Sequence, residues 1–374
     1  MMASTMAPPR PAAPKASGQT RATAQRPTAE AARRVGRYTI HLGQPVPVVG
    51  AAAVGGPMEG AGPLGKQLDH VYPDRLLGQR TWEQAESRML YDAVVRCCEK
   101  TGIALADVDL LYAGDLLNQI ISSSFAARDL DIPYIGLFGA CSTFTLGLGL
   151  AAMAVDGGYA RRAIAAVSSH HDTAERQYRF PTEFGGQRPL TAQWTATGAA
   201  AVLVGEPGQT GASGVAITHI TFGRVIDTGL KDPFDMGSCM AAAAADTIQR
   251  HFEDTGRSFS DYDQVATGDL ARVGHPVATE VLLKAGYDPG DRFTDCGILL
   301  YDPNKQDVHA GGSGCACSGI VFITYFLPQL SDGRLRRLLL VATGCLHSKT
   351  SYQQRESIPT VAHAIAFEQV GEST

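Results

Sequence analysis

Apolar residues along this chain alternate between short continuous runs and longer stretches with helical spacing. A short apolar run from Val46 predicts a strand, a glycine-rich loop over 55–63 follows, and apolar positions from 81 to 100 recur with the period of an α-helix. Apolar runs at 107–112 and 134–138 predict two further strands, each before a helix. Strands that are apolar throughout and alternate with helices are typical of α/β layers around a mostly parallel sheet.

Three short patterns occur twice, in the same order, in the two halves of the chain. The pairs are 109–116 (DLLYAGDL) and 263–270 (DQVATGDL), 139–142 (GACS) and 315–318 (CACS), and the apolar runs that precede His170 and His347. Three repeats in the same order indicate a duplication, which predicts two halves that pack as related layers. We place the halves at 38–208 and 209–374.

Residues 1–37 differ from the rest of the chain. They carry seven Lys or Arg against the single acid Glu30, are rich in Ala and Pro, and show no apolar periodicity. A segment that cannot bury apolar surface does not repay the entropy of ordering, so we predict a disordered arm. Its positive charge also suits an anionic membrane surface or a transit peptide, although its prolines disfavour an amphipathic helix.

Composition excludes several classes of protein. With 44% hydrophobic and 18% charged residues, the chain can bury a sizeable core, and its apolar runs are far shorter than the roughly 20 residues that cross a bilayer. The eight cysteines lack the spaced pairs of a zinc site, which predicts reduced thiols and no metal. No basic helix with interleaved aromatics indicates a nucleic-acid partner.

Particular motifs resemble a known family. The duplicated halves, Cys141 between a strand and a helix, and the run 197–203 (TGAAAVL) are similar to the thiolase and ketoacyl-synthase superfamily. Within it, longer phrases resemble the stage V sporulation protein AD family. These phrases are GPLG (62–65), AGDLLNQ (113–119), LFGACST (137–143), SSHHDTAERQYRFPTEFGGQRP (168–189), GRVIDTG (223–229), DMGS (235–238) and AGGSGCACS (310–318). The resemblance implies a five-layered αβαβα fold and a homodimer.

Cys141 is the main candidate for a functional residue. It follows a predicted strand and begins a predicted helix, next to Ser142. The N–H groups at a helix N-terminus carry partial positive charge, which is expected to lower the pKa of a thiol and to attract anions. In the enzymes that the chain resembles, this position carries the acylated nucleophile. The other interpretation is a buried, small apolar residue.

The resemblance also implies that the catalytic partners of the cysteine are missing. Where thiolases carry a His and chain-initiating ketoacyl synthases an Asn, this chain has Ser313. At the other partner position, Asp269 and its neighbours offer neither His nor Asn, and the nearby His275 is either a surface residue or a substitute. Without these oxyanion donors we expect a binding protein rather than an enzyme. An acyltransferase that uses Cys141 is the alternative.

Further polar residues could complete a ligand site. A histidine pair follows a predicted strand, at the end where doubly wound sheets place ligands, and is either structural or part of the pocket. The loop after it mixes Arg with aromatics, which suits a flat carboxylate or internal ion pairs. The acids of the two repeats either cap helices or line the site. The candidate ligand-binding residues are Cys141, Ser142, His170, His171, Arg179, Glu183, Arg188, Asp115, Asn118, Asp269, Ser313 and Cys317.

The resemblance implies a non-catalytic protein that binds dipicolinic acid, alone or with calcium, during its uptake into the developing spore. It implies the other SpoVA membrane proteins as partners and a peripheral position on the inner membrane of the forespore. We expect no cofactor. A structural assembly factor with a vestigial pocket is a third possibility.

Overall fold

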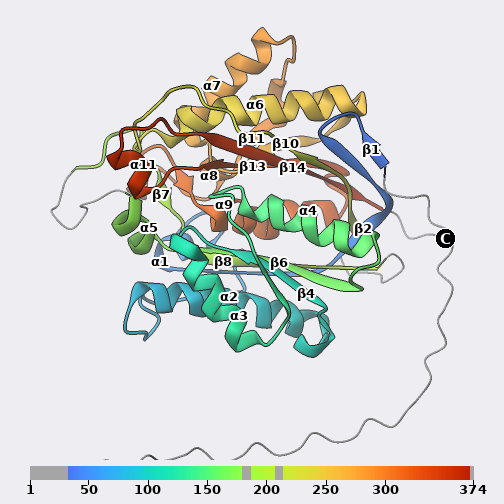
Figure 1. The fold of residues 1–374 in the computed structure, drawn as a ribbon, viewed down its shortest axis with the longest axis vertical. Coiled ribbons are helices and arrows are strands. Elements are labelled where there is room, and N and C mark those ends of the chain that lie inside the picture. The colour runs from blue at the N-terminus through green and yellow to red at the C-terminus, as the bar shows by residue number, and fades with distance from the viewer. Residues whose placement is uncertain (1–32, 179–186, 207–213, 371–374) are drawn as a thin grey trace, which may run out of the picture.

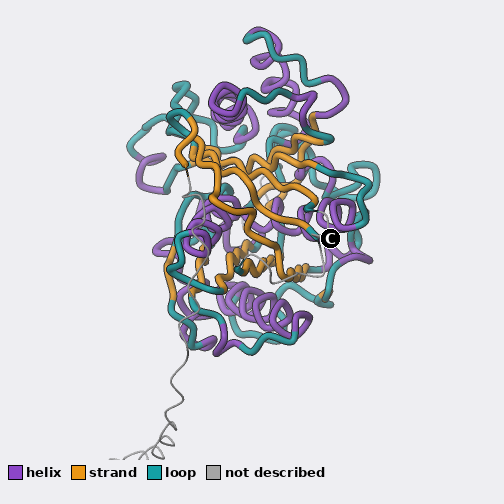
Figure 2. The backbone as a smooth tube through the Cα atoms, turned by 90° about the vertical axis from the view of Figure 1, so that its right-hand side faces the viewer, coloured by secondary structure: helices purple, strands orange, loops and turns teal. Residues whose placement is uncertain are grey.

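The computed structural model describes residues 33–178, 187–206 and 214–370, which form five layers. Two sheets lie one above the other, with one pair of helices between them and one pair on each outer face (Figures 1 and 2). The outer helices are α2 (Trp82–Thr101) and α3 (Ile121–Leu130) on one side and α6 (Met236–Thr255) and α7 (Ala271–Lys284) on the other, and the central ones are α4 (Thr143–Asp156) and α9 (Cys315–Val321).

The two sheets are joined by one long strand, β2 (Thr39–Gly55). Its residues 39–47 pair with the second sheet, and its residues 48–55 pair with the first. From the joining strand outward, the first sheet contains β8 (Gly198–Gly205), β6 (Arg162–Ser169), β4 (Leu110–Gly114) and β5 (Tyr134–Gly136). The second contains β9 (Val215–Phe222), β14 (Thr360–Gln369), β13 (Arg337–Cys345), β10 (Gln264–Thr267) and β11 (Phe293–Asp295).

The two halves repeat one topology. The strand order β5-β4-β6-β8-β2 in the first half corresponds to β11-β10-β13-β14-β9 in the second. The outer helices α2 and α6 have 20 residues each, and each ends at a glycine in the left-handed conformation, Gly102 with φ 67° and Gly256 with φ 68°. Glycine is favoured there because it lacks a Cβ. The predicted duplicated α/β architecture is therefore confirmed.

The central helices pack in an apolar environment. All residues of β8 are buried, because helices cover both faces of the sheet. Between the sheets, the fully buried ring of Phe144 on α4 lies 5.9 Å from that of Phe322, which stacks on Phe367 of β14 at 4.3 Å. These ring contacts link the two halves through the middle layer.

The predicted end of the N-terminal arm at residue 37 is wrong. Residues Arg33–Val35 form β1, which pairs antiparallel with β2. The carboxylate of Asp254 then accepts hydrogen bonds from the backbone N–H groups of residues 37, 38 and 39 at 3.1, 2.7 and 2.9 Å. Backbone pairing and this carboxylate order a segment that has no apolar pattern. Residues 1–32 of the predicted arm lie outside the described residues.

Shorter elements connect these layers. They are α1 (Pro57–Gly60), β3 (His70–Val71), α5 (His171–Tyr178), β7 (Trp194–Thr195), α8 (Cys296–Leu299), β12 (Gly312–Ser313), α10 (Leu327–Ser331) and α11 (Lys349–Gln353). None of the helices in the described ranges is long and apolar enough to cross a membrane.

Candidate functional site

Cys141 lies in a sharp turn between β5 and α4. The preceding Ala140 has φ 49°, the left-handed conformation that a residue with a Cβ adopts only at an energetic cost. Ser142 is the N-cap residue and α4 begins at Thr143, so the cysteine precedes the helix rather than beginning it. Backbone strain of this kind is concentrated at functional sites.

Two side chains from the second half of the chain approach the thiol. The Oγ of Ser313 lies 3.8 Å from the Sγ of Cys141. The carboxylate of Asp269, which follows β10, accepts hydrogen bonds from Ser313 Oγ at 3.0 Å, from the backbone N–H of Gly314 at 3.1 Å and from Thr343 Oγ1 at 2.7 Å. These bonds fix the acid and the hydroxyl on the same side of the cysteine.

This environment keeps the thiol protonated. Burial raises the pKa of Cys141 well above its usual value, and the negative charge of Asp269 raises it further. Burial also raises the pKa of Asp269, to about 6, so that this carboxyl is mostly ionised at neutral pH. The expectation that the helix N-terminus lowers the cysteine pKa is wrong, because burial and a full negative charge outweigh about half a positive charge at the helix end.

The cavity in front of the thiol is small. Its volume is about 30 Å³, which is room for about one water molecule. The rings of Tyr178 and His347 lie 5.1 Å apart at this cavity. Its walls are formed by Leu116, Ala140, Cys141, Ala174, Tyr178, Thr195, Met236, Ser313, Cys345 and His347.

The predicted histidine pair does not line this cavity. The buried ring of His170 is held by the backbone, with Nε2 2.8 Å from the carbonyl oxygen of Arg75 and Nδ1 accepting from the N–H of Asp172 at 3.2 Å. His171 stacks on Trp194 with ring centroids 3.5 Å apart. The ring of His170 is thus bound by backbone groups and that of His171 packs on an indole, and neither residue is among those that line the cysteine cavity.

Asp115 and Ser142 bond to nearby backbone. Asp115 accepts from Leu117 N–H at 2.8 Å and from the N–H and the hydroxyl of Ser123, both at 2.7 Å. The Ser123 N–H belongs to the first turn of α3, so Asp115 caps this helix, one of the two roles considered for it. The hydroxyl of Ser142 donates to the carbonyl of Gly139 at 2.6 Å and thus closes the turn around the cysteine.

Three further predicted residues, Cys317, Asn118 and Arg188, are not among those that line the cavity. The thiol of Cys317 lies 3.6 Å from the carbonyl oxygen of Gly268. Asn118 is exposed, and Arg188 forms an ion pair with Asp307 at 3.2 Å. Arg179 and Glu183 lie outside the described residues.

Sequence reasoning missed several walls of the cavity, above all Tyr178 and His347. One signal for His347 was present, since it occupies the place in the second repeat that His170 occupies in the first. No comparable signal marks Tyr178, which comes to the cavity through the position of α5. Its hydroxyl donates to the carbonyl of Leu116.

The fold and the cysteine turn together define a thiolase-like protein. The chain superimposes on the crystal structure of 3-oxoacyl-[acyl-carrier-protein] synthase III from Aquifex aeolicus VF5 with a TM-score of 0.52 and 13% identity, covering 86% of this chain and 99% of that one. An OleA variant from Xanthomonas campestris gives a TM-score of 0.52 and 16% identity, covering 88% and 99%. Identities this low show a common fold alone.

Within this class, the chain belongs to the stage V sporulation protein AD family. The family model matches residues 36–368. The chain is also 48% identical over 337 residues to the stage V sporulation protein AD of Bacillus subtilis strain 168, which covers 90% of this chain and 98% of that protein.

Proposed function

We propose that this protein binds dipicolinic acid without catalysis and acts in its uptake into the developing spore. The observation that supports this most is the state of the cysteine. Cys141 stands where a thiolase-like enzyme has its nucleophile, but it is buried beside Asp269, whose charge raises the pKa of the thiol. Membership of a sporulation family supports a role during spore formation.

The same arrangement argues against acyl transfer. A nucleophilic cysteine must lose its proton, and the ionised Asp269 opposes the thiolate. The oxyanion of a thioester intermediate would also lie next to this carboxylate, and a nearby negative charge destabilises an oxyanion. The hydroxyl of Ser313, 3.8 Å from the sulfur, already donates to the acid. The neutral thiol is therefore proposed as a ligand contact, while the hydroxyl stays bonded to the acid.

Dipicolinate is larger than the cavity, so its binding requires the cavity to open. A pyridine ring with two carboxylates is several times larger than the single water that about 30 Å³ would hold. Tyr178 and His347 offer flat faces at the cavity, and aromatic faces suit a planar ring. We propose that these two rings separate to admit the ligand between them.

A calorimetric titration with dipicolinate tests the proposal. The parent protein is expected to bind, and Cys141→Ala to bind at least tenfold more weakly while unfolding at the same temperature. Cys98→Ala is the matched control, because this buried cysteine lies on α2 and is not among the residues that line the cavity. Equal affinity in the parent and Cys141→Ala would place the ligand elsewhere.

Incubation with acyl-CoA and a malonyl acceptor tests the alternative function. The proposal predicts no sustained product formation. Turnover by the parent that Cys141→Ser abolishes would instead establish an acyltransferase. Slow labelling of the thiol by a reactive thioester is compatible with either function, so turnover is the criterion.

We also propose a homodimer, formed at the edge of the first sheet. Among the strands that the structure describes, none pairs with the outer edge of β5, and apolar side chains are exposed around it: Ile135 (38%), Phe138 (48%), and Ile121 (39%) and Phe125 (46%) at α3. An unpaired edge with an apolar surround favours pairing with another chain, and a second copy offers the same surface.

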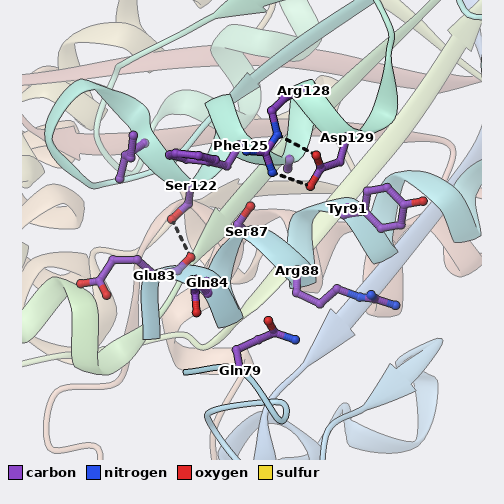
Figure 3. A pocket seen from close by; sticks show the side chains of 12 residues that line it. Gln79, Glu83, Gln84, Ser87, Arg88, Tyr91, Ser122, Phe125, Arg128 and Asp129 are labelled. Carbon is purple, nitrogen blue, oxygen red and sulfur yellow. Dashed lines mark hydrogen bonds and ion pairs between the residues drawn. The ribbon is translucent and has the colours of Figure 1, made fainter. Parts of the chain in front are cut away.

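A groove of about 700 Å³ lies beside this edge, between α2 and α3 (Figure 3). Ser87 and Tyr91 of α2 face Phe125 and Arg128 of α3 across it. We propose that the groove belongs to the same dimer surface. Sedimentation of the parent as a dimer and of Phe138→Glu as a monomer would support this assignment, whereas a monomeric parent at micromolar concentration would contradict it.

The proposed function has three further parts. Calcium accompanies dipicolinate, the protein docks to the other SpoVA membrane proteins, and it lies peripherally on the inner spore membrane. Calcium has a physical reason, since it would neutralise the charge of dipicolinate beside Asp269. Titration with and without calcium chloride measures its effect, and tighter binding with calcium is expected.

A further inference from the structure

Gln193 lies beside the cysteine site and is not among the residues that line its cavity. It immediately precedes β7 and is buried, with 1% of its surface exposed. β7 pairs parallel with β12, so that Thr195 lies opposite Ser313. The backbone N–H of Ala196 also donates to the carbonyl of Ser313 at 2.9 Å. A segment from the first half of the chain thus runs along the segment of the second half that carries the hydroxyl of the site.

The side-chain amide of Gln193 bridges two backbone carbonyls of the second half. Its Nε2 donates to the carbonyl oxygen of Asp269 at 2.5 Å and to that of Gly312 at 3.1 Å. An amide NH₂ group has two N–H donors, so these bonds use both of them. Since Gly312 directly precedes Ser313, the bridge connects the two segments that carry the acid and the hydroxyl beside Cys141.

The carboxylate of Asp269 makes a second connection between the same two segments. It accepts hydrogen bonds from Ser313 Oγ at 3.0 Å and from the Gly314 N–H at 3.1 Å. Gln193 therefore holds the backbone of Asp269, while the carboxylate of Asp269 holds the turn at Ser313. Because a carboxylate moves with its own backbone, loss of the amide bridge would let Asp269 shift relative to the hydroxyl and the thiol.

The backbone of both segments has conformations that depend on contacts from outside. Ala271, two residues after Asp269, has φ 53°, and Gly314 in the other segment has φ 100°. A left-handed residue with a Cβ costs free energy and persists only where surrounding contacts fix it. The carboxylate of Asp295 fixes one such place by accepting from the Ala271 N–H at 2.9 Å, and Gln193 fixes the carbonyl of Asp269 itself.

We propose that Gln193 is a positioning residue of the cysteine site, which holds Asp269 and Ser313 together beside the Cys141 thiol. This role rests on the proposed function only in that the site at Cys141 is taken as the functional one, because no ligand takes part in the contacts. Gln193 acts through Asp269. The fixed carboxylate opposes loss of the thiol proton, and a displaced carboxylate opposes it less.

The rate at which iodoacetamide alkylates Cys141, measured against pH, tests this role, because the thiolate is the species that reacts. Gln193→Met keeps the length of the side chain and removes both donors. The midpoint of the pH profile is expected to fall by roughly half a pH unit, the change that follows when two charges about 4 Å apart move about 1 Å further apart at an effective dielectric constant of about 20. Gln306→Met is the matched control, since this buried glutamine donates to the Met58 carbonyl at 2.7 Å and is not among the residues that line the cavity.

The same substitution in the Asp269→Asn background separates positioning from a merely structural role. Without a charge to displace, Gln193→Met is expected to leave the midpoint of Asp269→Asn unchanged. An equal shift in both backgrounds would overturn the assignment. So would an unchanged midpoint in the parent background, even with faster alkylation at every pH, because Gln193 would then only tighten the packing.

Gln193→Asn replaces Gln193→Met in both backgrounds if the latter does not fold. It keeps the amide but is one methylene shorter, so it cannot hold both carbonyls at the distances seen here, and the same outcomes decide. The alkylation assay contains no dipicolinate. A protein that fails to bind dipicolinate would therefore contradict the proposed function and leave the role of Gln193 to be decided by the midpoints.

Discussion

Replacing Asp269 by Asn should turn the neutral Cys141 thiol into a more acidic one. Asp269 is isosteric with Asn, and an amide oxygen can still accept from Ser313 Oγ and the Gly314 N–H while its NH₂ faces Thr343. Two unit charges roughly 4 Å apart repel by about 4 kcal/mol at an effective dielectric constant of about 20. Since about 1.4 kcal/mol corresponds to a tenfold change, the thiolate fraction at neutral pH can rise up to roughly 1,000-fold.

The rate of alkylation by iodoacetamide, followed by peptide mass spectrometry at Cys141 from pH 6 to 11, measures this change. The midpoint of the pH profile reports the thiol pKa, which we expect to fall in Asp269→Asn by at least one pH unit. Asp115→Asn is the control, because it is the equivalent acid of the first repeat and caps α3 instead. An unchanged midpoint in a correctly folded Asp269→Asn protein would show that Asp269 does not control the thiol.

Three other perturbations test the structure. The pKa of Asp269 is about 6 in the folded protein against 3.8 for a free carboxyl, so its contribution to stability is present below about pH 3.8 and is lost as the pH rises through 6. In urea unfolding, the parent should therefore lose ~1.4 kcal/mol more of its free energy of unfolding than Asp269→Asn does between pH 5 and 8. An equal loss in the two proteins would contradict this. Phe144→Ala should cost about 3–5 kcal/mol in urea unfolding, because it removes a fully buried ring next to Phe322, and a cost under 1 kcal/mol would refute this packing. Asp254→Ala should speed hydrogen exchange at residues 37–39, and unchanged exchange would show that the carboxylate does not hold this segment.

The fold could be predicted because duplication leaves a pattern in the sequence itself. Each repeat has the same order of apolar runs and glycines, and the structure shows the same strand order in both halves. The place of Cys141 was predictable for the same reason, since its short pattern recurs at the second central helix, although residues 315–318 lie inside α9 and Cys141 precedes α4. The residue at which the N-terminal arm ends could not be predicted, because pairing with β2 orders β1 and the distant Asp254 binds the residues after it.

The chemistry of the site depends on contacts that the sequence does not record. The thiol pKa is set by burial and by Asp269, which reaches Cys141 only when the two halves pack together. A histidine pair after a strand was a reasonable candidate, yet His170 bonds to the backbone and His171 stacks on Trp194, while Tyr178 lines the cavity. Local patterns thus identified the cysteine and Ser313, whereas the remaining walls required the tertiary structure.

A crystal structure of the protein grown with dipicolinate tests the central claim most directly. The account predicts electron density for the ring between the separated side chains of Tyr178 and His347, with a carboxylate against the Cys141 thiol and no covalent bond to sulfur. Density for dipicolinate only at a place away from Cys141, or an unchanged closed cavity at Cys141 in protein saturated with dipicolinate, would contradict it.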